Sequence, residues 1–184
     1  LARYPDEGFL RLDAVADVGD VWEFPEQNYH YDWNERRNHR GGTYIMDKPT
    51  TARAAGWKDT GDVWAYGYFY HDWADSSTPI QGFDIAHRTF YPAHVSRYGA
   101  RKDALYYFYN VFEELDVSGE WYLDRESGWL YVYPSVELKG ARIEMTVTHR
   151  SVIDAKNVNY VTFEGFTVKG TRADAITVEG DHNT

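Results

Sequence analysis

A repeated pattern near the end of the sequence constrains the fold more than any other feature. Ile153 and Ile176 lie 23 residues apart, each in a short apolar stretch bounded by Gly, Asn and Asp. A repeat of roughly 20–30 residues, built from short strands and polar turns, is typical of a solenoid whose coils stack their apolar residues. The pattern therefore predicts that residues 151–184 form coils of a parallel β-helix, with Ile153 and Ile176 in register.

The β-helix is incomplete within this sequence. About three coils are normally needed to close a solenoid core, and fewer than two fit between residue 151 and Thr184. We therefore expect a piece of a longer protein, with association through the open end of the β-helix. The sequence carries no signal-peptide pattern and no apolar run long enough to span a bilayer. An extracellular or periplasmic location is favoured, and no membrane partner is expected.

Charge and composition exclude several classes of protein. The formal net charge is −10, and such a surface repels nucleic acid. The chain has no cysteine, which excludes a disulfide scaffold and a cysteine zinc site. Aromatic residues make up 17% of the chain, with 16 Tyr and 7 Trp. Such side chains combine a flat apolar face with a polar edge, which suits the C–H faces of sugar rings.

Strand signals dominate the first part of the chain. Residues 62–73 and 105–112 are rich in aromatic residues, and 120–134 predicts a hairpin that turns at Gly128. In the first of these segments, period 2 places Trp64, Tyr66, Tyr68 and Tyr70 on one face and Val63, Ala65, Gly67 and Phe69 on the other. Such an aromatic face packs into a core more often than it lines a glycan cleft.

The predicted organisation is all-β, with a β-rich inserted or accessory region over 1–140 and truncated β-helix coils over 141–184. Long loops are expected over 13–60 and 72–104, and a strand over 141–147. The one helix signal, residues 50–56, is short. The acidic residues between 113 and 126 are expected to form a solvated, charged hairpin edge that prevents strand addition.

Two segments resemble bacterial right-handed parallel β-helix proteins of the pectin-lyase-like superfamily. Residues 110–124, Asn-Val-Phe-Glu-Glu-Leu-Asp-Val-Ser-Gly-Glu-Trp-Tyr-Leu-Asp, are similar to a hairpin that leads into the coils in that superfamily. Residues 157–168, Asn-Val-Asn-Tyr-Val-Thr-Phe-Glu-Gly-Phe-Thr-Val, resemble its usual rung. The resemblance implies a right-handed β-helix interrupted by an inserted β-domain, and a carbohydrate-active neighbourhood. It does not specify one reaction, because fold does not fix chemistry.

The segment 71–75 carries the densest set of reactive side chains. His71, Asp72, Trp73 and Asp75 combine an imidazole, an indole and two carboxylates. A glycosidase needs two carboxyl groups about 5–10 Å apart, so Asp72 and Asp75 are candidate catalytic residues. His71 and Trp73, with Trp64 and Tyr68, are candidate substrate-binding residues. The alternative is a turn capped by Asp side chains, with Trp73 in the core.

A second candidate pair lies between the expected coils. Asp174 is a candidate catalytic residue and Arg172 a candidate substrate-binding residue, because loops between coils form the rims of grooves. The alternative is an exposed contact between the two side chains, which contributes little. No histidine pair has a metal-ligand spacing, and no cofactor is expected. Calcium is the one cofactor left open, and no ligand motif supports it.

These features leave three alternative functions for the protein. The favoured one is a glycoside hydrolase that acts on a neutral or weakly charged polysaccharide or oligosaccharide, because a surface of charge −10 repels anionic uronates. The alternatives are a polysaccharide lyase that acts on uronates, and a non-catalytic glycan-binding or surface β-helix protein.

Overall fold

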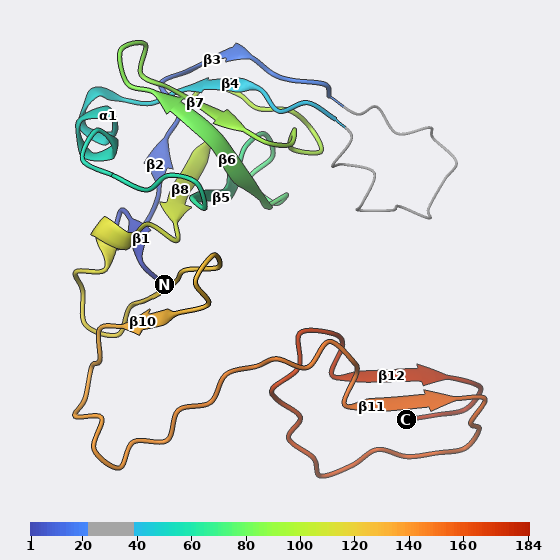
Figure 1. Ribbon diagram of the computed structural model, residues 1–184. Helices are drawn as coiled ribbons and strands as arrows, with labels where there is room; N and C mark the ends of the chain where they lie inside the picture. Colours follow the sequence, from blue (N-terminus) through green and yellow to red (C-terminus); the bar gives the residue numbers. More distant parts are fainter. Residues whose placement is uncertain (22–38) are drawn as a thin grey trace. The chain divides into compact units, whose positions relative to one another are not determined.

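The computed structural model describes residues 1–21 and 39–184, and it divides the chain into two compact units. Unit 1 comprises Leu1–Val136 and unit 2 comprises Glu137–Thr184. The division falls close to the expected boundary between residues 140 and 141. The described residues are mostly β, with one short α-helix (Figure 1).

Unit 1 is built on an antiparallel sheet of eight strands. Their order is β1-β8-β5-β6-β7-β4-β3, and β2 also pairs with β8. The strands are β1 (Arg3–Tyr4), β2 (Leu10–Arg11), β3 (Ala14–Asp17), β4 (Thr43–Ile45), β5 (Trp64–Tyr68), β6 (Ser76–Asp84), β7 (Thr89–Pro92) and β8 (Leu105–Tyr109). Much of the region expected to be loop, 13–60 and 72–104, therefore contains strands.

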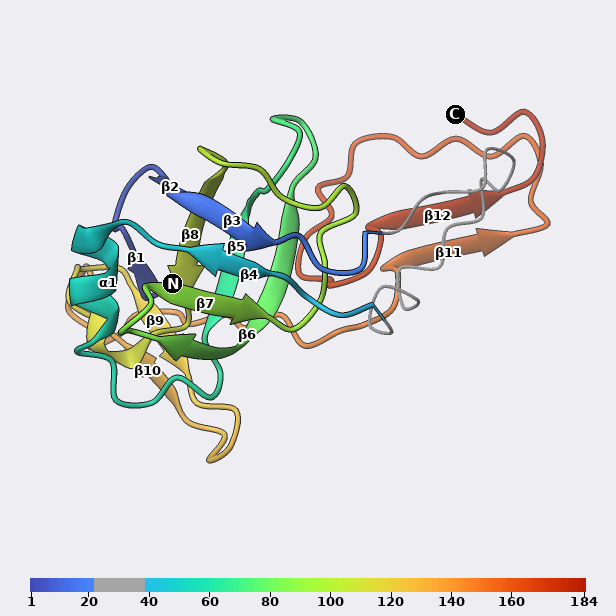
Figure 2. The same ribbon diagram turned by 90° about the horizontal axis from the view of Figure 1, so that it is seen from above.

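The sheet folds over at β6. The first half of this long strand pairs with β5 and the second half with β7, and the register shifts between Ile80 and Gly82. Figures 1 and 2 show β3, β4 and β7 passing across β5 and β8 as a second layer. Phe90 of β7 lies 5.4 Å from the ring of Tyr106 and 5.0 Å from that of Phe108, although β5 and β6 separate their strands in the sheet. The core of unit 1 fills the space between the two layers.

Helix α1 (Lys48–Ala54) lies at one end of the folded sheet (Figure 1). Asp47 caps it by accepting a hydrogen bond of 2.7 Å from the backbone N–H of Thr50, which satisfies one of the free donors of the first turn. Thr50, Thr51 and Ala54 face the core. The helix coincides with the weak signal at 50–56, and its Arg53 has a structural role described next.

The polar residues of the 110–124 segment tie unit 1 together. Glu114, in the 3-10 helix η2 (Phe112–Glu114), is fully buried and accepts two hydrogen bonds from Arg53, of 2.8 and 2.9 Å, and one of 2.5 Å from the Trp57 indole. Glu120 is also buried and accepts from the backbone N–H groups of Asp116 and Val117. The expectation of a solvated acidic edge is wrong for these two carboxylates, because each is buried with its own donors.

The predicted hairpin is present as β9 (Trp121–Leu123) and β10 (Leu130–Val132), which pair antiparallel. Gly128 has a φ of 77°, as the turn requires. Asn110 joins the hairpin to the sheet, because its side chain donates to the Leu123 carbonyl oxygen and accepts from the Leu123 N–H, both at 3.2 Å.

Unit 2 contains one parallel pair of strands, β11 (Ile153–Lys156) and β12 (Ile176–Glu179). Ile153 pairs with Ile176, so the predicted register is observed. A parallel bridge between Thr148 and Thr171 has the same offset. The strand expected over 141–147 is absent: this segment has no strand partner and is exposed. Unit 2 is therefore a two-stranded parallel arrangement with long connections.

Candidate functional site

The alternation predicted for residues 63–69 is observed, with the aromatic side chains on the less buried face. Val63, Ala65 and Phe69 are buried in the core. On the opposite face of the sheet, β5 and its partner β8 present five half-buried rings, which we call the outer aromatic face: Trp64, Tyr66, Tyr68, Tyr107 and Tyr109. The core of unit 1 therefore lies against the opposite face of β5, and the outer aromatic face is half-buried.

The loop between β5 and β6 carries an aromatic cluster. Trp73 stacks on the His71 ring at 5.2 Å, and Tyr98 meets both edge-on, at 5.5 Å from Trp73 and 4.7 Å from His71. Trp73 is 70% exposed. The alternative that Trp73 belongs to the core is therefore wrong, and its indole is available to a ligand.

A cavity of about 180 Å³ lies beside this cluster. Its lining combines the two aromatic rings with opposite charges and hydroxyl groups: Trp73, Tyr98, Asp75, Arg97, Ser76 and Ser96. We call it the Trp73 cavity. Planar carboxylate and guanidinium groups beside aromatic rings suit a small ring that carries hydroxyl groups.

The two candidate catalytic carboxylates have different partners. Asp72 is exposed and forms an ion pair of 2.7 Å with Arg101. Asp75 lines the cavity. Burial raises the pKa of Tyr66, and the nearby Tyr68 hydroxyl and Asp75 carboxylate raise it further. Tyr66 is therefore neutral at physiological pH.

The second candidate pair belongs to unit 2. The Arg172 guanidinium lies 3.4 Å from the His149 ring nitrogen Nε2. The backbone N–H of Arg172 donates to the Thr148 carbonyl oxygen at 2.8 Å. Asp174 is exposed. The expected contact between Arg172 and Asp174 is not among the ion pairs of the described residues.

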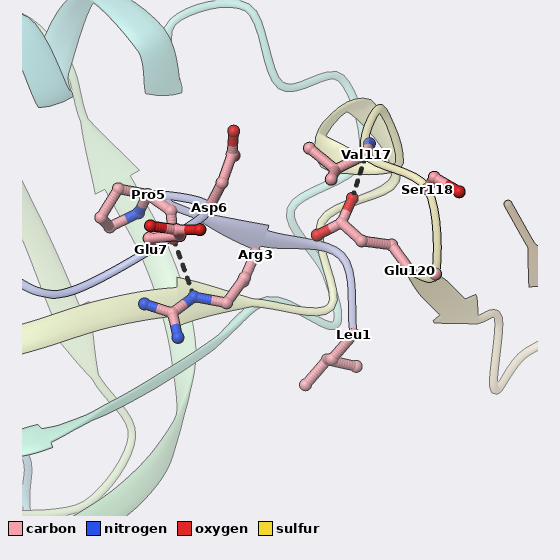
Figure 3. A pocket seen from close by; sticks show the side chains of 9 residues that line it. Leu1, Arg3, Pro5, Asp6, Glu7, Val117, Ser118 and Glu120 are labelled. Atoms are coloured by element: carbon pink, nitrogen blue, oxygen red, sulfur yellow. Dashed lines mark hydrogen bonds between the residues drawn. The ribbon is translucent and has the colours of Figure 1, made fainter. Parts of the chain in front are cut away.

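A larger pocket, of about 710 Å³, lies elsewhere in unit 1. Figure 3 shows Arg3, Asp6 and Glu7 on one side of it and Glu120 on the other. The donors drawn there satisfy internal partners: Arg3 donates to the Pro5 carbonyl oxygen, and the Val117 N–H donates to Glu120. Because the described residues that line this pocket include no aromatic ring, its chemistry suits a sugar less well than that of the smaller Trp73 cavity.

Sequence reasoning named Trp73 and Asp75, which line the cavity, and His71, whose ring stacks on Trp73, but it did not name Arg97 or Tyr98. Arg97 and Tyr98 come from a loop that no periodicity marks, and only folding brings them beside Trp73. Tyr107 and Tyr109 could have been assigned to a face by the alternation of their own strand, which pairs Tyr107 with Tyr66 and Tyr109 with Trp64.

Residues 1–21 and 39–184 bring no three His, Asp or Glu side chains into an arrangement suited to a metal ion. These ranges also contain no helix with the length and apolar character that crossing a bilayer requires. Comparison of the chain with models of protein families, with curated proteins and with solved structures finds no match.

Proposed function

We propose that this chain is part of a polysaccharide-acting protein of the right-handed parallel β-helix type, and that unit 1 binds a neutral sugar in the Trp73 cavity. The β-helix assignment is supported by the parallel pairs in unit 2, which repeat the same offset at Ile153–Ile176 and Thr148–Thr171. A constant offset between parallel pairs is what stacked coils produce. The hairpin over 120–134 is consistent with the same resemblance.

Sugar binding is supported above all by the exposed indole of Trp73 beside a small polar cavity. Trp73 and Tyr98 offer ring faces, and Asp75 and Arg97 offer groups that bind hydroxyls in pairs. The opposite charges of Asp75 and Arg97 favour a neutral ring, because an anionic ring would face the carboxylate. This argument supports a neutral glycan over a uronate.

Binding has more support than hydrolysis in this part of the protein. A glycosidase pair must face the same sugar. Asp75 lines the cavity, whereas Asp72 is tied to Arg101 and is not one of the lining residues. We keep the prediction that the longer protein hydrolyses the bound polysaccharide. Within this chain, Asp75 is the carboxylate best placed to take part, because it lines the cavity.

The test is a binding panel of xylan, mannan, β-glucan and polygalacturonate, measured by isothermal titration calorimetry. We expect a neutral polysaccharide to bind. Trp73→Ala should weaken that binding about tenfold, since removing one stacked ring costs about 1.4 kcal/mol. Trp129→Ala is the matched control. Trp129 is also an exposed indole, at 67%, but it lies on the β9–β10 hairpin and is not a lining residue of the Trp73 cavity. Absence of binding to every neutral polysaccharide, or equal binding by Trp73→Ala, would contradict the proposal.

A second measurement separates binding from hydrolysis. If Asp75 is a catalytic carboxylate, Asp75→Asn abolishes release of reducing sugar by the longer protein while the polysaccharide still binds. Products that are only unsaturated uronates would instead identify a lyase.

A further inference from the structure

The outer aromatic face is continuous with the Trp73 cavity. Tyr66 and Tyr68 belong to β5, and Gly67 between them pairs with Ser76 of β6, which lines the cavity together with Asp75. The rings of Tyr66 and Tyr107 lie 5.1 Å apart and close to parallel, at 35°. Trp64 and Tyr109 form the next row across the same two strands, at 6.1 Å and 32°. One line of rings therefore leads from the cavity along β5 and β8.

The polar groups on this face are mostly uncharged hydroxyls. The Tyr109 hydroxyl lies 2.5 Å from the Ser77 hydroxyl of the neighbouring strand β6. Burial raises the pKa values of Tyr66 and Tyr109, so both phenols stay protonated and neutral. Arg3 contributes a cation, but its guanidinium lies 3.7 Å over the Tyr107 ring, which it braces from the β1 side. The face thus offers rings and hydroxyls to a neutral ligand.

The length of the face exceeds that of one sugar ring. Trp64 and Tyr68 are four residues apart in a strand, which corresponds to about 13 Å. The cavity lies beyond Tyr68 along the chain and adds a further position. A ligand that covers both must be a chain of several rings.

We propose that the outer aromatic face binds the continuing chain of the glycan whose one ring occupies the Trp73 cavity. This inference rests on the proposed function and specifies its substrate class. The ligand is an internal stretch of an extended neutral polysaccharide, and neither a free sugar nor a short oligosaccharide fills the site. Trp64 stacks on a ring that lies outside the cavity.

The test is the dependence of affinity on chain length. The di-, tetra- and hexasaccharide of the neutral polysaccharide that binds in the panel are titrated into the full chain. We expect the wild type to bind the hexasaccharide at least about tenfold more tightly than the disaccharide, because one added aromatic stack contributes about 1.4 kcal/mol. Trp64→Ala should remove this gain without changing the disaccharide Kd, whereas Trp73→Ala should weaken both ligands.

The outcomes separate the two proposals. If wild type binds neither oligosaccharide nor the polysaccharide, the proposed function fails. If it binds di- and hexasaccharide equally, or if Trp64→Ala keeps the full gain, the cavity stands and the extended site is wrong. Trp64→Phe guards against misfolding, since it keeps a ring beside Tyr109. We expect this variant to keep most of the gain with length, and loss of the entire gain would contradict a stacking role for position 64.

Discussion

Units 1 and 2 are both built from short strands, but they differ in what stabilises them. Unit 1 buries large rings between two layers of a folded sheet, including Tyr44, Phe90, Tyr106 and Phe108. In unit 2 no residue is buried, and Ile143, Met145 and Phe166 are each more than 60% exposed. Backbone pairing alone contributes little net stability, because the unfolded chain pairs equally well with water. Pairing therefore defines the register of unit 2, whereas a core is what holds unit 1 together.

The largest expected difference is in amide hydrogen exchange of the full chain. Amides of β5 and β8 should exchange at least about a thousandfold more slowly than those of β11 and β12, since core strands open only with global unfolding. Mass spectrometry of proteolytic peptides measures both regions in one sample. Equal protection of β11 and β12 would contradict the comparison and would show that unit 2 gains a core, for example by association.

A matched pair of core and surface substitutions tests the same difference. Phe108→Ala should lower the free energy of unfolding by about 4 kcal/mol, because it empties the centre of the unit 1 core. Phe166→Ala, at a side chain that is 63% exposed, should change it by less than about 0.5 kcal/mol. Urea unfolding followed by far-ultraviolet circular dichroism, which reports strands of both units, gives both values. A cost above about 1 kcal/mol at Phe166 would show packing in unit 2.

Breaking an ion pair should also cost more free energy of unfolding in unit 1 than in unit 2, although the difference is smaller than for the core substitution. Arg53→Ala leaves the fully buried Glu114 carboxylate with only the Trp57 donor, and it should cost about 3 kcal/mol. Arg142→Ala in unit 2 breaks a pair with Glu144 whose arginine is 84% exposed, and it should cost less than about 1 kcal/mol. The two variants are compared by the same urea titration. A similar cost for both would mean that burial of Glu114 does not decide the effect.

The alternation of residues was predictable, but which face is buried was not. Period 2 separates Trp64 and Tyr66 from Val63 and Ala65, whichever way the strand faces. Which face is buried depends on β8, whose Tyr106 and Phe108 fill the space beside the small residues of β5. That partner is about 40 residues away in sequence, and neither strand encodes the pairing by itself.

Local structure was predicted well where residues close in sequence determine it. The hairpin follows from its turn glycine, and the register of Ile153 with Ile176 follows from the repeat. Strands β6 and β7 were missed. Ser76, Ser77 and Pro79 have low strand propensity, and they form a strand here because β6 pairs with both β5 and β7. Of the Trp73 cavity, the sequence marked the 71–75 segment but gave no sign of Arg97 and Tyr98, which fold in from another loop.

In its burial, the β9–β10 hairpin is intermediate between the core of unit 1 and the exposed strands of unit 2. It belongs to unit 1 but is largely exposed. Its turn depends on Asp124, which accepts a hydrogen bond from the Ser127 hydroxyl and others from the backbone N–H groups of Ser127, at 3.1 Å, and Glu126, at 3.0 Å. The Ser127 hydroxyl makes the largest contribution to lowering the pKa of Asp124 below its usual 3.8. The stabilisation is therefore complete above pH 3.8 and is lost as the pH falls through the lower, folded value.

This effect should be the smallest of those considered, because Asp124 is only half-buried and solvent screens its carboxylate. Carboxyl-carbon NMR titration of the folded chain should place the Asp124 pKa below 3.8. In Ser127→Ala the first of its donors is removed, so the pKa should rise towards 3.8 while the two backbone donors keep it from reaching that value. Identical titrations of wild type and variant would mean that the Ser127 hydroxyl does not hold the turn. The hairpin would then depend on the pairing of β9 with β10, as unit 2 depends on β11 and β12.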